Sequence, residues 1–267
     1  MGIDAIINEL KSKFWVQFFN RRAELMELFH RKKHRQIQKL QNKFEGDKCF
    51  IIGNGPSLTT KDLEMIAANG YRTFASNRIY NLFDKTTWRP TFYACSDEKL
   101  YRDSRDIIDN LDDCMKFLPM DLYDKSNAQS GFYYFTRIPA PSNRKTPAFQ
   151  TNLLKKFGEG NTITYHMMQL AAGMGFKEIY LLGVDFSYAI SIGIDGKIVE
   201  DKSVKNYAWD NDQQPPNLPN IQWNYYAYQS ALRESSKYGI KIFNATRGGK
   251  LEVFERVDID VLLESAT

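Results

Sequence analysis

One short segment, Lys48-Cys-Phe-Ile-Ile-Gly-Asn-Gly-Pro-Ser-Leu58, constrains the fold of this 267-residue chain more than any other. Its apolar part, residues 49–52, predicts a buried strand, and the Gly-Asn-Gly-Pro-Ser run predicts a tight loop. A helical pattern follows. This order is typical of nucleotide-phosphate sites in α/β proteins, because glycines let the backbone approach an anion and helix amides point at it. The loop matches neither the dinucleotide fingerprint nor the P-loop, so a simple turn between strand and helix is the alternative.

Apolar runs and helical patterns alternate along the rest of the chain. Strands are expected at residues 72–77, 91–95, 116–119, 132–136, 178–183 and 241–244, and helices at 100–111, 162–174 and 221–238. This alternation predicts a Rossmann-like α/β fold, a mainly parallel sheet with helices on both faces. Ligands bind at the carboxyl edge of such sheets, so the polar residues that follow the strands are candidates for one site. These residues are Asn54, Asn77, Asp97, Asp185 and Asn244.

The first 47 residues differ in charge from the remainder. Residues 11–43 hold ten Lys and Arg against two acids, and apolar residues recur there at helical spacing. We therefore expect two parts, a basic amphipathic helical arm at 1–47 and a Rossmann-like nucleotide-binding domain at 48–267. The aromatic cluster Phe14, Trp15, Phe18 and Phe19 suits an anionic membrane surface. A helix docked on the domain and a dimerisation arm are the alternatives.

Composition excludes several classes of protein. The three cysteines and three histidines are scattered, which argues against a disulfide framework and against a zinc site. No apolar run approaches the 18 residues of a membrane span, and no signal peptide is visible. We expect a cytoplasmic protein, peripheral at the inner membrane face if the arm binds lipid. Nucleic acid is not an expected partner, because the basic excess is confined to the arm.

Four segments together resemble a known group of proteins. They read GNGPSL, SNRIY, FYACSD and NTITYHMMQLAAGMGFKEIYLLGVDFSY. They are similar to bacterial polysaccharide-locus proteins that share a domain with 6-hydroxymethylpterin diphosphokinase-like proteins and flagellar motility accessory factors. They resemble, more distantly, bacterial sialyltransferases that use a CMP-sugar donor. The resemblance covers residues 48–263 and leaves the arm outside.

The resemblance to sialyltransferases implies a set of donor contacts. In those enzymes the glycine loop holds the nucleotide, the Gly-x-Asp-Phe block lines the cytidine, and tyrosines steady the leaving phosphate without a metal. The residues implied here are Gly53, Asn54, Gly55, Ser57, Asn77, Thr162, Thr164, Gly183, Asp185, Phe186 and Tyr188. For Asp185, a cap or turn residue is the alternative role.

The chain departs from the sialyltransferases in one respect. Those enzymes use a histidine in the C-terminal third as general base, and this chain has none after His166. Removing a proton from an alcohol needs a base that is free at neutral pH. The candidates are Asp97, Asp210, Asp212 and His166. For His166, a position inside a predicted helix favours a packing role.

Two enzyme classes and one binding class follow. The first is a metal-independent glycosyltransferase that acts on a bacterial surface polysaccharide or lipid-linked glycan, with a nucleotide-sugar donor and no cofactor. The second is a diphosphokinase that uses ATP, with magnesium held by Asp97 and Asp185. The third is a nucleotide-sugar-binding protein without catalysis.

Overall fold

The computed structural model describes residues 14, 17, 18, 21, 24–126, 131–138, 145–188, 190–192, 198–200, 205–209 and 219–264. Its strands are β1 Lys48–Ile52, β2 Arg72–Ser76, β3 Phe92–Ala94, β4 Met115–Pro119, β5 Tyr133–Phe135, β6 Glu178–Leu182, β7 Ile190–Ile192, β8 Ile198–Glu200, β9 Lys241–Asn244 and β10 Glu255–Arg256. Its α-helices are α2 Arg31–His34, α3 Thr60–Ala68, α4 Glu98–Asp103, α5 Arg105–Asp109, α6 Ile163–Met174, α7 Ile221–Ser236 and α8 Ile259–Glu264. The described residues also form the 3₁₀ helices η1 Arg35–Leu40, η2 Ile79–Leu82 and η3 Met120–Lys125.

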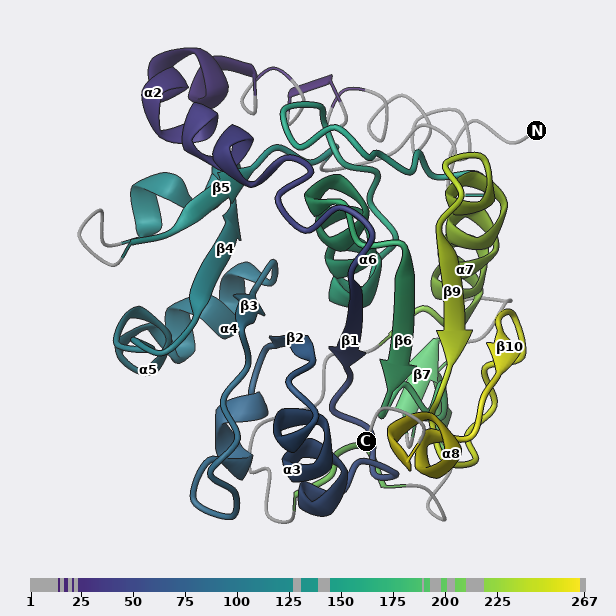
Figure 1. The fold of residues 1–267 in the computed structure, drawn as a ribbon. Coiled ribbons are helices and arrows are strands. Elements are labelled where there is room, and N and C mark those ends of the chain that lie inside the picture. The colour runs from purple at the N-terminus through teal and green to yellow at the C-terminus, as the bar shows by residue number, and fades with distance from the viewer. Residues whose placement is uncertain are drawn as a thin grey trace.

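An eight-stranded sheet in the order β10-β9-β6-β1-β2-β3-β4-β5 forms the centre of the fold. Every neighbouring pair in it is parallel, which confirms the expected Rossmann-like α/β class. The arrowheads of β1, β6 and β9 point toward the same edge (Figure 1). The chain leaves β1 for β2 on one side and returns through α6 to β6 on the other. The carboxyl ends of β1 and β6 therefore flank the point where the strand order reverses, where ligands bind in open α/β sheets.

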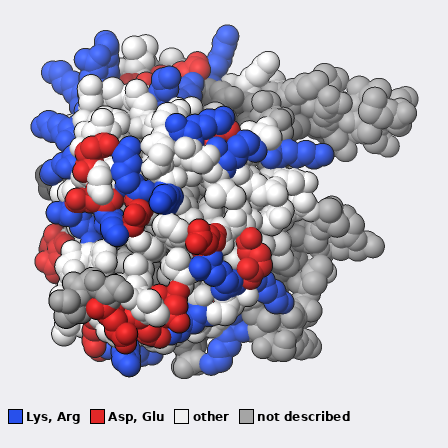
Figure 2. All heavy atoms as spheres, turned by 45° about the vertical axis from the view of Figure 1, so that its right-hand side comes forward, with Lys and Arg blue, Asp and Glu red and all other residues white. Residues whose placement is uncertain are grey.

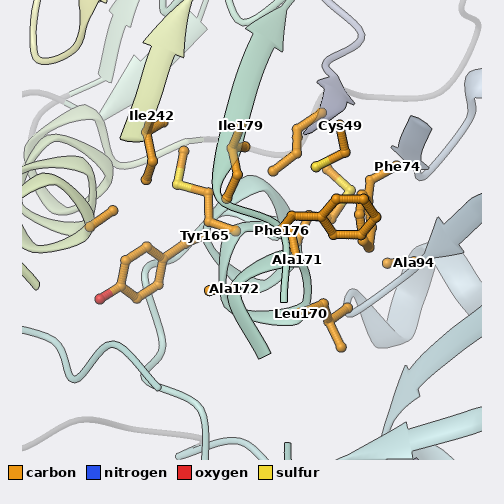
Figure 3. Packing of buried hydrophobic residues seen from close by; sticks show 14 of the residues in the cluster. Cys49, Phe74, Ala94, Tyr165, Leu170, Ala171, Ala172, Phe176, Ile179 and Ile242 are labelled. Atoms are coloured by element: carbon orange, nitrogen blue, oxygen red, sulfur yellow. The ribbon is translucent and has the colours of Figure 1, made fainter. Parts of the chain in front are cut away.

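Two apolar cores cover the two faces of this sheet. On one face, α6, α7 and the segment around η1 pack against strand residues such as Cys49 and Ile179 (Figure 3). On the other face, α3, α4, α5 and α8 pack against alternate residues such as Phe50 and Tyr180. This alternation follows from the period of two in a strand, and it explains why the central strands are apolar throughout.

Two expected helices differ from the observed ones. The helix expected at 100–111 begins earlier, at Glu98, because Asp97 caps it with an Oδ1 that accepts from the Leu100 amide at 2.8 Å. It is also interrupted at Ser104, which separates α4 from α5. The arm expected at 1–47 is α-helical at the described residues 24–29 and 31–34, but it does not continue as an α-helix to residue 44. Its final part is the short helix α2, the 3₁₀ helix η1 and a run of turns at 41–46.

The packing of the segment after α2 explains why the α-helix does not continue there. Ile37 and Leu40 are buried in the core and lie three residues apart, the repeat of a 3₁₀ helix. Asn42 then takes a left-handed φ of 54°, which ends any helix. Phe44 stacks on Phe176 with ring centroids 5.1 Å apart. Residues 37–44 of the predicted arm therefore pack on the same core as the sheet, while Trp15 and Phe19 lie outside the described residues.

In the part of the chain that the structure describes, no helix has both the length and the apolar character needed to cross a membrane.

Candidate functional site

A cavity of about 630 Å³ opens at the carboxyl edge of the sheet. The loops after β1, β2, β3 and β6 line it, together with the start of α6 and part of α7. Its size lies in the range of small-ligand sites. The cavity gathers most of the residues predicted from the sequence: Gly53, Asn54, Gly55, Asn77, Asp97, Thr162, Thr164, Gly183, Asp185, Phe186 and Tyr188 all line it.

The two glycines of the first loop are required by contact with the loop after β6. The Gly55 amide donates to the Gly183 carbonyl at 2.9 Å. A Cβ on Gly53 would lie 2.3 Å from that carbonyl oxygen, and one on Gly55 would lie 1.9 Å from Asp185 Oδ2. Gly183 itself has a φ of 68°, which favours glycine. Loop-to-loop packing thus explains these glycines before any ligand is considered.

Two asparagine side chains in the cavity have unsatisfied oxygens. Asn54 Nδ2 donates to the Ser76 carbonyl at 3.2 Å, which directs its amide, and its Oδ1 is buried without a hydrogen-bond partner. Asn77 Oδ1 is likewise buried and unpartnered, and Asn77 has a left-handed φ of 54°. Buried polar atoms are almost always paired, so two such atoms in one cavity point to a ligand. Because an amide oxygen only accepts, the ligand groups that meet it must donate.

Asp185 forms a hydrogen bond with the end of the glycine loop. Its Oδ2 accepts a hydrogen bond from Ser57 Oγ at 2.8 Å. Burial raises the pKa of Asp185, and the hydrogen bond from Ser57 opposes this shift. Ser57 does not line the cavity, so the structure places it behind Asp185.

The N-terminus of α6 opens on the cavity. Thr162 caps this 12-residue helix by accepting from the Thr164 amide at 3.3 Å. Burial raises the pKa of Tyr228, whose ring lies 5.8 Å from that of Phe186, and both threonine hydroxyls oppose this shift. A helix N-terminus carries a partial positive charge and free amides, which suit a phosphate. Tyr188 is partly buried, and burial raises its pKa while the Asn224 side chain opposes this shift.

The predicted catalytic candidates are placed differently. Asp97 lines the cavity, but its Oδ1 caps α4. His166 is fully buried in α6 behind the cavity wall, and its ring lies 5.2 Å from that of Phe135. Asp210 and Asp212 lie outside the described residues.

Sequence reasoning missed three charged residues of the cavity, Arg78, Arg137 and Glu159. Arg137 comes directly after the strand expected at 132–136, so the rule that selected Asn77 and Asp97 would also have found it. Glu159 stands between Gly158 and Gly160, just before the cap of α6, and only the fold brings it to the cavity. Among the described residues, no three His, Cys, Asp or Glu side chains lie together as a metal site.

Comparisons with known proteins agree with this fold. The family model described as 6-hydroxymethylpterin diphosphokinase MptE-like matches residues 22–191. No curated protein matches the chain. Among solved structures, the MAf glycosyltransferase from Magnetospirillum magneticum AMB-1 is similar, with a TM-score of 0.53 and 16% identity over 82% of this chain and 35% of that one. This chain therefore spans about a third of that protein, and the likeness shows the fold alone.

These matches confirm the expected resemblance to 6-hydroxymethylpterin diphosphokinase-like proteins and motility accessory factors. The more distant likeness to sialyltransferases, and the donor contacts that it implies, stay predictions.

Proposed function

This chain belongs to the 6-hydroxymethylpterin diphosphokinase MptE-like family, and from that premise we propose that it is a glycosyltransferase with a nucleotide-activated sugar donor. The donor is a CMP-sugar, and the acceptor is a surface polysaccharide or lipopolysaccharide precursor in a bacterium. The reaction needs no metal. The fold that the chain shares with a MAf glycosyltransferase supports the class of reaction.

The observation that carries this proposal is the pair of unpartnered amide oxygens on Asn54 and Asn77. Each needs a donor, and a nucleotide sugar supplies donors as ribose hydroxyls, sugar hydroxyls and the amino group of cytosine. The α6 N-terminus, with Thr162 and Thr164, would meet the phosphate. Tyr188 would donate to the leaving phosphate, so hydrogen bonds rather than a metal stabilise the developing charge.

The second candidate is the diphosphokinase named in the family description. It requires magnesium close to the phosphates of ATP, with Asp97 and Asp185 as ligands. Both carboxylates already have partners, since Asp97 caps α4 and Asp185 accepts from Ser57. A protein that binds a nucleotide sugar without catalysis is the third candidate.

Thermal shift and calorimetric titration with CMP, CDP, UDP and ATP, each with and without magnesium, separate these candidates. A ligand that binds only the folded state raises its stability by an amount set by concentration over Kd. We expect stabilisation by CMP in EDTA, and release of CMP from CMP-sialic acid when acceptor or water is present. Stabilisation by ATP alone, and only with magnesium, would favour the diphosphokinase. Binding of CMP without any CMP release from CMP-sugars would favour the binding protein.

We further propose that the helical segment before the sheet binds an anionic membrane surface. Leu25, Leu28 and Phe29 are 52%, 66% and 75% exposed. Residues 31–43 follow with six Lys and Arg and no acid. Figure 2 shows Lys and Arg side chains along the upper edge of the molecule, at the height of α2 in Figure 1. Apolar side chains beside such a charge suit acidic headgroups, which attract each basic residue by about 1 kcal/mol.

Co-sedimentation with vesicles tests the membrane proposal. The protein should bind phosphatidylcholine vesicles only when phosphatidylglycerol is added, and salt should weaken this binding. A Leu28→Ser, Phe29→Ser variant should lose it. Binding to both vesicle types alike, or to neither, would contradict the proposal. A concentration-dependent dimer in sedimentation analysis would indicate that Leu25, Leu28 and Phe29 contact a second copy of the chain instead.

A further inference from the structure

Four ionisable side chains form a corner at one end of the cavity, in which one is fully buried and the other three are 16–19% exposed. Arg137 makes a two-bond pair with Asp121, Nε to Oδ1 at 3.1 Å and Nη2 to Oδ2 at 2.8 Å. Glu159 Oε2 lies 3.5 Å from Arg137 Nη1 and 3.5 Å from His166 Nε2. We call these residues, Asp121, Arg137, Glu159 and His166, the acid corner. Of the four, Arg137 and Glu159 line the cavity.

The guanidinium of Arg137 is not available to an anionic ligand. Besides the two bonds to Asp121, its Nη1 donates to the Ser96 carbonyl at 2.9 Å. The nearby carboxylates hold the pKa of Arg137 above its usual value, and its charge is compensated by Asp121. This arrangement leaves Glu159 as the carboxylate of the corner that can meet a ligand.

The position of Glu159 is tightly defined. Its Oε1 accepts from the Asn161 amide at 3.0 Å, across a turn in which Asn161 has a left-handed φ of 56°. Its Oε2 lies 3.5 Å from His166 Nε2, and Glu159 lines the cavity. A cavity-lining carboxylate that is held by one oxygen and leaves the other free to accept has the geometry of a proton acceptor.

His166 lies directly behind this oxygen. The imidazole is fully buried, and neither ring nitrogen has a hydrogen-bond partner. Burial lowers the pKa of His166 more than Glu159 raises it, which favours the neutral ring, and a neutral imidazole has one nitrogen that can accept. A buried histidine without partners is costly unless the site uses it.

We propose that Glu159 is the general base of the transfer reaction and that His166 is its positioning residue. The inference rests on the proposed glycosyltransferase function. In the step, the O–H bond of the acceptor breaks and Glu159 Oε2 takes the proton. The acceptor oxygen forms a bond to the anomeric carbon, and the bond from that carbon to the phosphate oxygen breaks, leaving the electron pair on CMP. His166 Nε2 accepts a hydrogen bond from the protonated carboxyl.

The test compares Glu159→Gln with the wild-type chain in the release of CMP from CMP-sialic acid, with water or a hydroxyl acceptor. Gln keeps the oxygen that accepts from Asn161 but cannot take a proton. We expect turnover to fall about 10²–10⁴-fold, the range for loss of a general base. The calorimetric Kd for CMP should stay within about threefold, because the base does not hold the nucleotide. The turnover of Glu159→Asp, which keeps the carboxylate, should lie between that of the wild type and that of Glu159→Gln.

The pH profile distinguishes a proton acceptor from a structural carboxylate. Wild-type turnover should have an acid limb, and Glu159→Gln should lose it, although Arg137, Asp121, His166 and Asp97 remain around the site. His166→Asn should shift that limb and leave the Kd for CMP unchanged. Equal turnover in the wild type and Glu159→Gln would overturn this inference alone. A wild-type chain that binds no CMP and releases none would overturn the proposed function and this inference with it.

Discussion

The two ends of the cavity are built in opposite ways. At the end formed by the glycine loop, Gly53, Asn54 and Gly55 present a neutral surface on which an amide oxygen lacks a partner. At the acid corner, charged groups neutralise one another, and Arg137 uses its donors on Asp121 and Ser96. At the first end an amide oxygen is unpaired, whereas at the second end the charged groups pair with one another and the unpaired atoms are the ring nitrogens of His166.

This difference predicts which substitutions change ligand binding without changing stability, and which change stability. A polar atom that has no hydrogen-bond partner until a ligand binds contributes little to the free energy of unfolding. Its removal should therefore weaken ligand binding and leave stability intact. A buried ion pair behaves conversely, because removal of one member leaves the other charged and desolvated. Four substitutions test this contrast.

The largest expected effect belongs to the acid corner. Arg137→Met leaves Asp121 and Glu159, which are only 19% and 16% exposed, without their cation. We expect a loss of about 3–5 kcal/mol in the free energy of unfolding, measured by urea denaturation. Arg72→Met is the matched control, because both members of its ion pair with Asp47 are exposed, 43% and 46%, and its loss should cost at most about 1 kcal/mol. Equal losses in the free energy of unfolding of the two variants would show that the acid corner is no more important for stability than an exposed ion pair.

Gly55→Ala should have the next largest effect, on the glycine loop. The new Cβ would meet Asp185 Oδ2 at 1.9 Å and the Gly183 carbonyl oxygen at 2.7 Å, so the loop must move. We expect CMP to bind at least about 100-fold more weakly, or about 2.7 kcal/mol, in calorimetric titration. Gly239→Ala is the control, because its Cβ would meet nothing within 4 Å and only its left-handed φ of 66° is strained. Unchanged CMP binding in Gly55→Ala would show that the ligand does not use this loop.

A smaller effect is expected from Asn54→Ala, which removes one unpartnered oxygen. CMP should bind about tenfold more weakly, or about 1.4 kcal/mol, while the urea midpoint stays near that of the wild type. Asn69→Ala provides the comparison, since Asn69 Nδ2 also donates to a backbone carbonyl, that of Met65 at 2.9 Å, but Asn69 does not line the cavity. If both variants bound CMP equally well, Asn54 would have no ligand role.

The smallest expected effect is a pH dependence at Asp185. Burial raises the pKa of its carboxyl, so the folded state holds this proton more tightly than the unfolded state does. The corresponding stability is full below the unfolded pKa and is lost as the pH rises through the folded pKa. Asp185→Asn keeps an acceptor for Ser57 and should flatten that part of the profile in urea denaturation.

Asp103→Asn is a control of opposite sign. A hydrogen bond from Lys99 lowers the pKa of Asp103, so its contribution is present above the unfolded pKa and is lost as the pH falls through the folded pKa. A profile in which Asp185→Asn and the wild type coincide would contradict the assignment of a buried, proton-binding Asp185.

Local patterns were sufficient for much of the fold. The apolar run before Gly53, the alternation of strands and helices, and polar residues after strands predicted a parallel sheet with a site at its carboxyl edge. They also selected Asn54, Asn77 and Asp185, because a strand end is recognisable in sequence and parallel strands bring their carboxyl ends together. Helix boundaries were harder. The spacing of Ile37 and Leu40 fits both a 3₁₀ and an α-helix, and core packing chose the first.

The sequence by itself therefore determined the α/β class and the edge of the sheet where polar loops gather, because both depend on periodicity and on turn residues that act locally. Only the tertiary structure decided which charges meet. Asp121, Arg137, Glu159 and His166 come from η3, the end of β5, the turn before α6 and α6 itself. No spacing along the chain joins them, since their contacts depend on how β4, β5 and α6 pack. The same holds for Ser57, which the resemblance to sialyltransferases implied as a ligand contact and which in the fold donates a hydrogen bond to Asp185.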